Sequence, residues 1–313
     1  MLSGSTPVPE LIGHPLGFLL LLGLYGGGAV LVWEALARWK KGWLAVVPLG
    51  AAYGIAEEGL ATKTFTDPHQ QFVITGIPGS YGNFARIEWV TFAGIDPFHA
   101  AVSMGLPFLL VALLFPELRG RSVVSNRGLM VSCTAFIAVV TLMFFTTDTD
   151  PILPLAAPLA FIGALGALFI AFGWKLPRGF LSSWMRSPAP TASPRSFFVV
   201  GFAWLFSLLF MFSIGSHIVP SARLLILFFL GSGAASLYFL LTRSGWHDNR
   251  KQKVAWVGGF SAAFLVWDAF LDVIGDIAVL AFSVSLAALV VWLWQHPAGY
   301  LRPDSVEPQR SSN

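Results

Sequence analysis

The stretch YGIAEEGLATKTFTDP, residues 53–68, places two adjacent carboxylates, Glu57 and Glu58, inside an apolar run. An ionised carboxylate in hydrocarbon costs several kcal/mol unless it is paired or protonated, so acids at membrane depth are candidates for a functional site. Adjacent helical residues point ~100° apart, so the two glutamates cannot reach water by one route. We therefore expect at least one of them to be buried and either protonated or paired, with Lys63 or His99 as its partner.

The composition around this stretch is that of a membrane protein. Of the 313 residues, 56% are hydrophobic and 11% are charged, whereas a soluble domain has about 25% charged residues. The charges cluster between apolar runs, each close to the ~20 residues that a helix needs to cross ~30 Å of hydrocarbon. Barrel strands are shorter and alternate in polarity. The sequence thus predicts an all-α fold, a polytopic transmembrane helical bundle whose main partner is the lipid bilayer.

The apolar runs predict about nine membrane helices. With the N-terminus outside and the C-terminus inside, all but three of the 19 Lys and Arg fall on the inner side, as cytoplasmic loops require. The three outer ones are Lys63, Arg86 and Arg223. The predicted helices are 15–36, 43–62, 97–115, 128–147, 152–174, 197–216, 223–242, 254–273 and 277–295.

The segments between and beyond the helices divide the chain further. Residues 1–14 form a short outer segment, and the first five helices occupy 15–175, with an outer, partly re-entrant loop at 63–95. A cytoplasmic linker rich in proline and serine, 176–196, precedes the last four helices at 197–295. The tail, 296–313, is expected to be disordered. Asp96 and Pro97 are typical of a helix start, although a longer third helix beginning near Glu88 is the alternative.

Depth and helical spacing place several ionisable groups at one level. At ~1.5 Å per residue, Glu57, Glu58, His99 and Asp268 all lie near the outer ends of their helices. Asp96, His99 and Ser103 share one helix face. We predict a catalytic or proton-binding group made of Glu57, Glu58 and His99. The lining of a substrate or ion pocket is expected from Lys63, Asp96, Ser103, His217 and Asp268.

No metal, cofactor or nucleic acid is expected. The single cysteine, Cys133, lies in a predicted membrane helix and offers no cysteine-based metal site. A metal at Glu57 and Glu58 would need a further ligand beyond His99, from His217 or Asp268. The formal charge of +3 reflects basic loops and needs no acidic partner.

Two pieces carry a resemblance to known families: GIAEEGLATKTFTDP, and FHAAVSMGLPFLLVALLFPE at residues 98–117. Together they resemble a group of uncharacterised polytopic membrane proteins of archaea and bacteria, which implies a prokaryotic cell (inner) membrane. Glu57, Glu58 and His99 are also similar to the paired glutamates and histidine of CAAX-prenyl-protease-like intramembrane proteins. Thr62 stands at the arginine position of that family's first motif, and Ile95 at the phenylalanine position of the second.

Three functions remain open at this level. An intramembrane hydrolase would use Glu57 or Glu58 as general base and His99 to hold water or an oxyanion. A proton- or cation-coupled transporter would use Glu57, Glu58 and Asp268 as its ion site, with Glu34 as the acid nearest the inner end. A noncatalytic structural or assembly protein would use the acids to hold helices together. Substrate and oligomeric state are not indicated.

Overall fold

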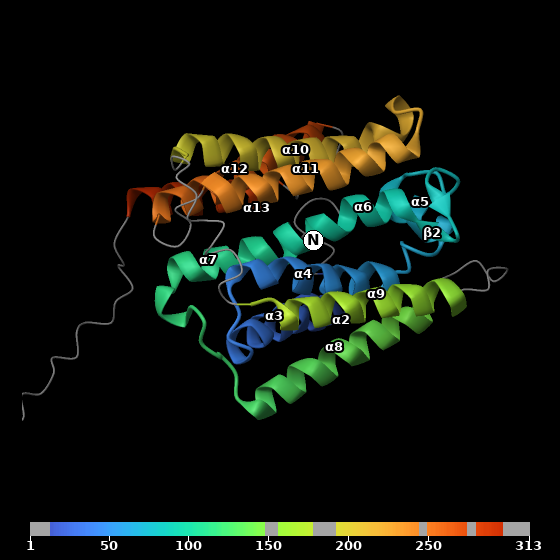
Figure 1. Cartoon of the computed structure of the whole chain (residues 1–313), viewed down its shortest axis with the longest axis horizontal. Coiled ribbons are helices and arrows are strands. Elements are labelled where there is room, and N and C mark those ends of the chain that lie inside the picture. Colours follow the sequence, from blue (N-terminus) through green and yellow to red (C-terminus); the bar gives the residue numbers. More distant parts are fainter. Residues whose placement is uncertain (1–12, 148–155, 178–191, 244–248, 274–279, 297–313) are drawn as a thin grey trace, which may run out of the picture.

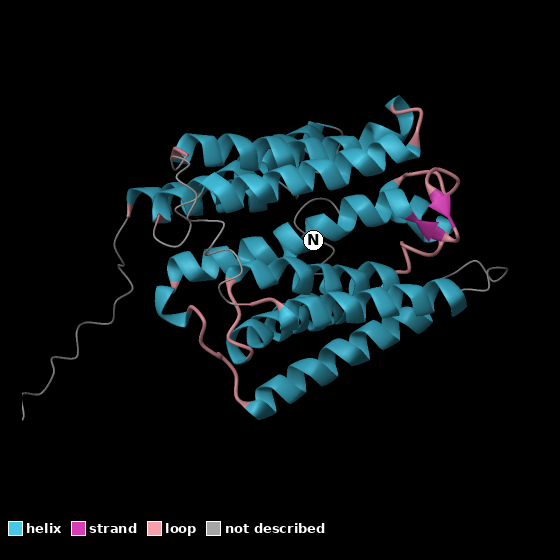
Figure 2. Ribbon diagram, in the orientation of Figure 1, coloured by secondary structure: helices cyan, strands magenta, loops and turns pink. Residues whose placement is uncertain are grey.

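The computed structural model describes residues 13–147, 156–177, 192–243, 249–273 and 280–296. Within them the chain is helical apart from loops and one short antiparallel strand pair (Figure 2). The elements are α2 (Pro15–Leu21), η1 (Leu22–Gly26), α3 (Gly27–Arg38), η2 (Trp43–Ala45), α4 (Val46–Gly54), η3 (Ile55–Ala61), α5 (Pro68–Thr75), β1 (Asn83–Phe84), β2 (Ile87–Glu88), α6 (Trp89–Phe98), η4 (His99–Gly105), α7 (Leu106–Leu114), η5 (Pro116–Leu118), α8 (Asn126–Thr146), α9 (Ala156–Lys175), α10 (Pro194–Ile218), α11 (Ala222–Arg243), α12 (Arg250–Val273) and α13 (Leu280–Gln295).

The helices form two groups with one long helix between them (Figure 1). Helices α2–α4, α8 and α9 make the N-terminal group, and α10–α13 make the C-terminal group. The run α6–η4–α7, residues 89–114, contacts α4 on one side and α11 and α12 on the other. We call this run the central helix, because it carries His99 and joins the two groups.

Seven helical segments of the described chain are long and apolar enough to cross a membrane. They correspond to the first seven predicted helices, and the central helix is one of them. Helices α12 and α13, where the sequence predicts two further spans, are not among the seven. The expected helical membrane bundle is therefore confirmed, while nine spans and the N-out orientation stay predictions.

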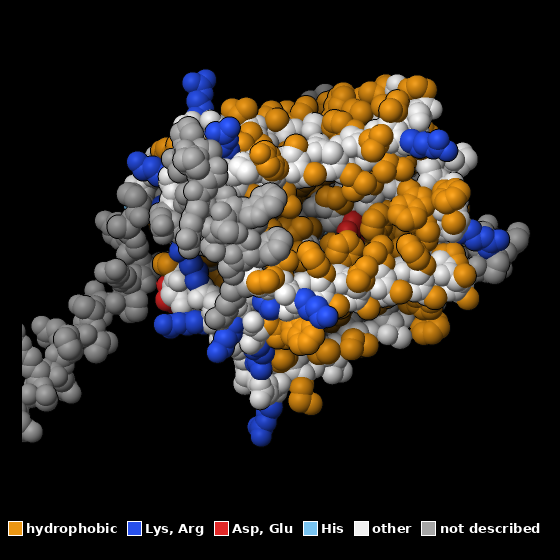
Figure 3. Space-filling view, in the orientation of Figure 1, with side chains coloured by type: hydrophobic (Ala, Val, Ile, Leu, Met, Phe, Trp, Pro, Cys, Tyr) orange, Lys and Arg blue, Asp and Glu red, His pale blue; other side chains and the backbone are white. Residues whose placement is uncertain are grey.

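Hydrophobic side chains cover the face between the two ends of the molecule (Figure 3). Phe145, Ile170 and Leu227 are examples of large apolar side chains that point outward. Such exposure is expected where lipid, and not water, surrounds the helices. Lys and Arg gather mainly at one end, drawn at the left in Figure 3. We call this end, which carries Lys41 and Arg119, the basic end.

The central helix begins earlier than Asp96 and Pro97 suggest. It starts at Trp89, directly after β2, so the predicted start at residue 97 is wrong and the longer alternative is correct. The residues before Asp96 are apolar, WVTFAGI, and extend the hydrophobic run into the predicted loop. Pro97 lies inside the helix, where it has no N–H to donate, and π-helical geometry follows from His99.

The rest of the predicted outer loop, residues 62–88, folds into a cap opposite the basic end (Figure 1). Helix α5 begins at Pro68, where the Asp67 side chain accepts a hydrogen bond from the backbone N–H of His69 at 2.8 Å. It ends at Gly76, whose φ of 71° suits a residue without a side chain. Phe65 and Ile87 are buried apolar side chains by which the cap packs onto the bundle.

Close packing between α4 and the central helix depends on glycine. A Cβ atom at Gly50 would lie 2.7 Å from the Cα atom of Ala100, so only glycine permits this approach. This close approach places η3, the polar end of the run α4–η3, against His99. Most of the predicted segments 1–14, 176–196 and 296–313 lies outside the described residues.

Candidate functional site

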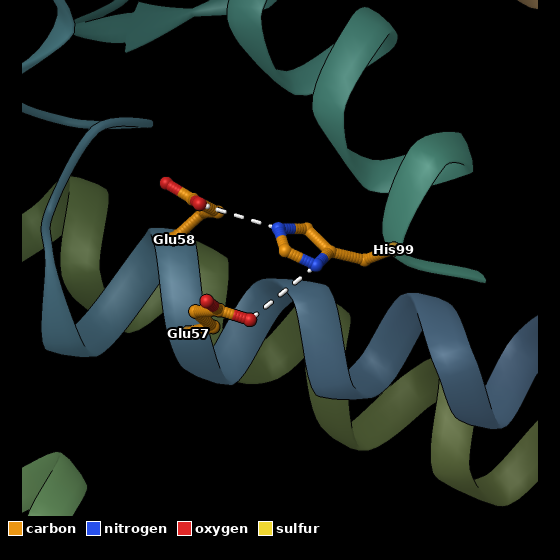
Figure 4. A group of neighbouring side chains, drawn as sticks. All are labelled: Glu57, Glu58 and His99. Atoms are coloured by element: carbon orange, nitrogen blue, oxygen red, sulfur yellow. Dashed lines mark hydrogen bonds and ion pairs between the residues drawn. The ribbon is translucent and has the colours of Figure 1, made fainter. Parts of the chain in front are cut away.

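The structure brings Glu57, Glu58 and His99 together (Figure 4). The imidazole stands between the two carboxylates: Nδ1 lies 3.3 Å from Oε2 of Glu57, and Nε2 lies 3.2 Å from Oε1 of Glu58. All three residues are buried. Of the two partners that the sequence left open, Lys63 and His99, the structure places His99 against the glutamates. We call the three residues the Glu–His–Glu cluster.

Glu58 has the richer set of hydrogen-bond donors. Its Oε2 accepts from the hydroxyl of Thr62 at 3.0 Å and from the hydroxyl of Thr64. The Thr64 hydroxyl also lies 3.0 Å from the backbone carbonyl of Glu58. Both threonines belong to the turn that follows η3, so the start of the cap fixes this carboxylate.

Glu57 faces aromatic residues. The hydroxyl groups of Tyr25 and Tyr53 lie next to its carboxyl group. The ring of Tyr53 stands edge-on to the imidazole of His99, with centroids 5.8 Å apart. Beyond the contact of Oε2 with His99, neither Oε2 of Glu57 nor the buried hydroxyl of Tyr53 has a hydrogen-bond partner among the described residues. The hydrogen-bonding groups around Glu57 are therefore less fully satisfied than those around Glu58.

Four of these side chains come from π-helical segments. Tyr25 lies in η1, the two glutamates lie in η3, and His99 opens η4. A π-helical turn interrupts the regular i→i−4 ladder and is frequent at functional sites. Three such segments meeting at one cluster mark this region as the part of the membrane helices that departs most from regular geometry.

Ser103 and Asp96 complete the polar region on the central helix. The hydroxyl of Ser103 lies 2.9 Å from Nδ1 of His99. A Cβ atom at Gly54 would lie 2.7 Å from Oδ1 of Asp96 and 3.0 Å from Cβ of His99, so both side chains lie against this glycine. Oδ1 of Asp96 is buried and has no hydrogen-bond partner among the described residues.

The donor atoms of the Glu–His–Glu cluster lie within 4.8 Å of one another, close enough to consider a metal ion. The lone pairs of Nδ1 and Nε2 point away from each other, and each nitrogen faces a different glutamate (Figure 4). An ion on either nitrogen would have one carboxylate beside it, whereas a zinc site needs three or four converging ligands. This arrangement does not suit a metal, and the expectation of none stays a prediction.

Three predicted pocket residues lie elsewhere. Nζ of Lys63 contacts the carbonyl oxygen of Thr147 at 3.4 Å and the ring of Phe144, and burial lowers the pKa of Lys63. His217 is exposed at the end of α10. Asp268 is buried in α12, where it accepts a hydrogen bond from Ser283 of α13. The sequence placed these groups at similar depth, but depth does not say which helices are neighbours.

A large cavity lies between the two helix groups, with a volume of about 700 Å³. Its wall includes Val47 of α4, Ala101 and Leu109 of the central helix, and Leu237 of α11. Figure 3 shows a hollow in the hydrophobic face with an acidic side chain at its bottom. Asp96 is the one acidic residue among the described residues that line the cavity. Glu57, Glu58 and His99 lie behind Asp96 and do not line it.

Sequence reasoning missed the tyrosines, the threonines and the cavity. Thr62 and Thr64 follow Glu58 by four and six residues, and this proximity is a signal that could have identified them. Tyr53 lies four residues before Glu57 on the same helix, and this spacing is a similar signal. Tyr25 gave no such signal, because its position depends on how the helices pack. The cavity requires knowledge of which helices form each group.

Comparisons with known proteins add no further constraint on the site. No family model matches the chain, and no curated protein or solved structure matches it.

Proposed function

We propose that the chain is a membrane transporter, in which movement of a substrate through the central cavity is coupled to protonation of Asp96 and the Glu–His–Glu cluster. The observation that carries the proposal is the position of Asp96. It is the acidic group on the cavity wall, and it lies beside His99 on the same helix. A substrate in the cavity would therefore contact Asp96. The Glu–His–Glu cluster lies behind Asp96 and would bind protons without contacting the substrate.

The charge of this region supports proton coupling. With both glutamates ionised and the imidazole protonated, the cluster carries one net negative charge, and ionised Asp96 would add a second. Unbalanced charge at membrane depth costs free energy. The free energy of binding one or two protons therefore depends strongly on the charge of the substrate in the cavity. Since the groups are in contact, they titrate as a unit.

The architecture supports movement. The cavity lies between two helix groups, and many transporters work by rocking one group against another around a site near the midplane. The π-helical segments η3 and η4 lie where the second helix meets the central helix. Irregular helical geometry beside such a site is common in transporters, because broken helices supply both ligands and hinges.

Proton flux in reconstituted liposomes tests the proposal. The liposomes would contain the pH-sensitive dye pyranine, and neutral, cationic or anionic amphiphiles would be added outside. We expect at least one of these three classes to drive a change in internal pH. Asp96→Asn should abolish the flux and Glu57→Gln should reduce it at least tenfold. Glu117→Gln, at an exposed acid away from the cavity, should leave it unchanged. No flux with any class, or full flux in Asp96→Asn, would refute coupling through Asp96.

A hydrolase is the second candidate, and one observation favours it. Ser103, His99 and Glu58 form a hydroxyl–imidazole–carboxylate series, with spacings of 2.9 and 3.2 Å. In such a series the serine oxygen bonds to an acyl carbon, its proton passes to the imidazole, and the leaving group departs with that proton. Cleavage of a farnesylated fluorogenic peptide or a fluorogenic phospholipid ester, lost in Ser103→Ala, would select this function.

We also propose the finer topology that the sequence predicts. Nine helices cross the cell membrane of a prokaryote, and the basic end faces the cytoplasm, because basic loops are retained there. Single cysteines placed at Arg127 and Arg86, in a Cys133→Ser background, test the orientation. A membrane-impermeant maleimide applied to whole cells should label residue 86 and spare residue 127, and the reverse pattern would invert the topology.

A further inference from the structure

We propose that the substrate of the cavity is an anionic amphiphile with one long hydrocarbon chain, which enters sideways from the membrane with its head group toward the basic end. This inference rests on the proposed transport function and names its substrate class. It follows from the length of the cavity, its lining, and the charges at its two ends.

The cavity is longer than one lipid chain. Its lining on the central helix runs from Phe92 to Ala112, about 30 Å at ~1.5 Å per residue. A lipid chain spans one leaflet, about half of the ~30 Å hydrocarbon core of a bilayer, so the cavity has room for one chain together with its head group. The volume of about 700 Å³ lies in the middle of the ~300–1,000 Å³ that small-molecule pockets occupy.

The lining between the ends is apolar. Leu109, Leu237 and Trp204 are typical of its wall, and they come from the central helix and from both α11 and α10. The hollow opens on the hydrophobic face of the molecule (Figure 3). A water-soluble ion or sugar would meet no hydrogen-bonding partners over most of this length. A hydrocarbon chain would contact the apolar wall along the whole length of the chain.

The two ends carry opposite charges. Three cationic residues line the cavity at the basic end: Lys41, Arg119 and Lys253. They come from three separate parts of the chain, so they converge on the cavity through the fold. The acidic lining residue, Asp96, lies toward the cap. An anionic head group is attracted to one end and repelled from the other, which fixes the orientation of the chain.

Two of the cationic residues, Lys41 and Arg119, are held in place by backbone carbonyl groups. Nζ of Lys41 donates to the carbonyl of Leu176 at 3.1 Å. The guanidinium of Arg119 donates to the carbonyl of Ala112 through Nε at 2.9 Å and through a terminal nitrogen at 2.7 Å. Carbonyl partners position these cations without neutralising them, so their charge remains for a head group.

Lysolipid binding tests the inference, since lysophosphatidylglycerol and lysophosphatidylcholine share a chain and differ in head-group charge. Binding would be followed by native mass spectrometry of the whole chain released from detergent. The Asp96→Asn variant would be used as the background, and the measurement requires neither transport nor hydrolysis. We expect at least tenfold tighter binding of lysophosphatidylglycerol. The double variant Lys41→Gln, Arg119→Gln should lose this preference.

Two further variants control the result. Arg127→Gln removes an exposed cation of the basic end that does not line the cavity, and it should keep the preference. Ala101→Phe fills the apolar section and should weaken both lysolipids at least tenfold. Equal binding of the two lysolipids, or an intact preference in the Lys41 and Arg119 double variant, would overturn the inference. Selective binding without proton flux would instead retain the ligand class and refute the transport function.

Discussion

Two of the buried glutamate sites among the described residues differ in how completely their carboxylates are satisfied. Near the basic end, Glu34 accepts hydrogen bonds from Arg38 at 2.7 Å, from Ser122 at 2.5 Å and from the backbone N–H groups of Val123 and Val124 at 2.6 and 3.1 Å. In the Glu–His–Glu cluster, two carboxylates share one imidazole.

The difference sets a fully satisfied carboxylate apart from the carboxylates that we propose to be functional. Four donors, one of them a guanidinium, hold Glu34 in a single ionised state and attach the loop before α8 to α3. Buried charge with that many partners stabilises a fold once it is formed, and removing it leaves the donors unsatisfied. Glu57 has fewer donors and shares His99 with a second carboxylate, so protons can redistribute without breaking the helix packing.

The largest expected effect is at Glu34. Glu34→Ala should lower the free energy of unfolding by about 3 kcal/mol, because Arg38 and two loop N–H groups lose their acceptor. Chemical denaturation in mixed detergent micelles would measure this loss. Glu117→Ala, at an exposed acid, is the matched control and should change the free energy by less than about 0.5 kcal/mol. Equal losses in the two variants would remove the distinction drawn here.

Next in size is Gly50→Ala, which tests the helix contact that supports the cluster. The new methyl group would meet the backbone of Ala100, which cannot rotate away, so we expect a loss of about 2 kcal/mol in unfolding free energy. Gly163→Ala is the control, since a Cβ atom there has no neighbour within 4 Å. The control variant should be neutral or more stable, as alanine favours a helix. A neutral Gly50→Ala would show that the helices separate easily.

A smaller effect is expected at Glu57. Glu57→Gln keeps the side-chain shape and removes a buried charge, so the unfolding free energy should change by less than about 1 kcal/mol or rise. Glu34→Gln provides the sharper comparison, with an expected loss of about 2 kcal/mol through its charged hydrogen bonds. Melting curves of both variants in one detergent would compare them. A loss at Glu57 as large as that at Glu34 would make the cluster structural.

The last prediction concerns pH and Glu88 of the cap. Burial raises the pKa of Glu88 to about 7, and a hydrogen bond from Asn83 opposes this rise. Because the folded state holds the proton more tightly than the unfolded state, the stabilisation is present below pH ~4.5 and is lost as pH rises through about 7. Melting temperature between pH 4 and pH 8 should fall less steeply in Glu88→Gln. An unchanged slope would assign the pH dependence to other groups.

The sequence predicted the bundle and its polar cluster because both depend on local signals. Apolar runs and basic loops locate membrane helices, and adjacent acids in an apolar run indicate a site whatever their partners are. The choice of His99 over Lys63 depends on which face of the central helix meets η3, and that face follows from Gly50 and Gly54. Asp268 has a similar depth but faces Ser283, since α12 packs against α13.

The π-helical segments make the site depend on chain length in each helix as well as on residue identity. A π-helical turn holds about one residue more than an α-helical one, so it can take up a single inserted residue. The same residues of η4 wound in a regular ladder would rotate one flank of the helix by ~100° against the other. In such a regular helix, His99 could not face the glutamates while Ala101 faces the cavity. Single-residue insertions and deletions, and not substitutions alone, are thus the genetic steps that would build or dismantle such a site.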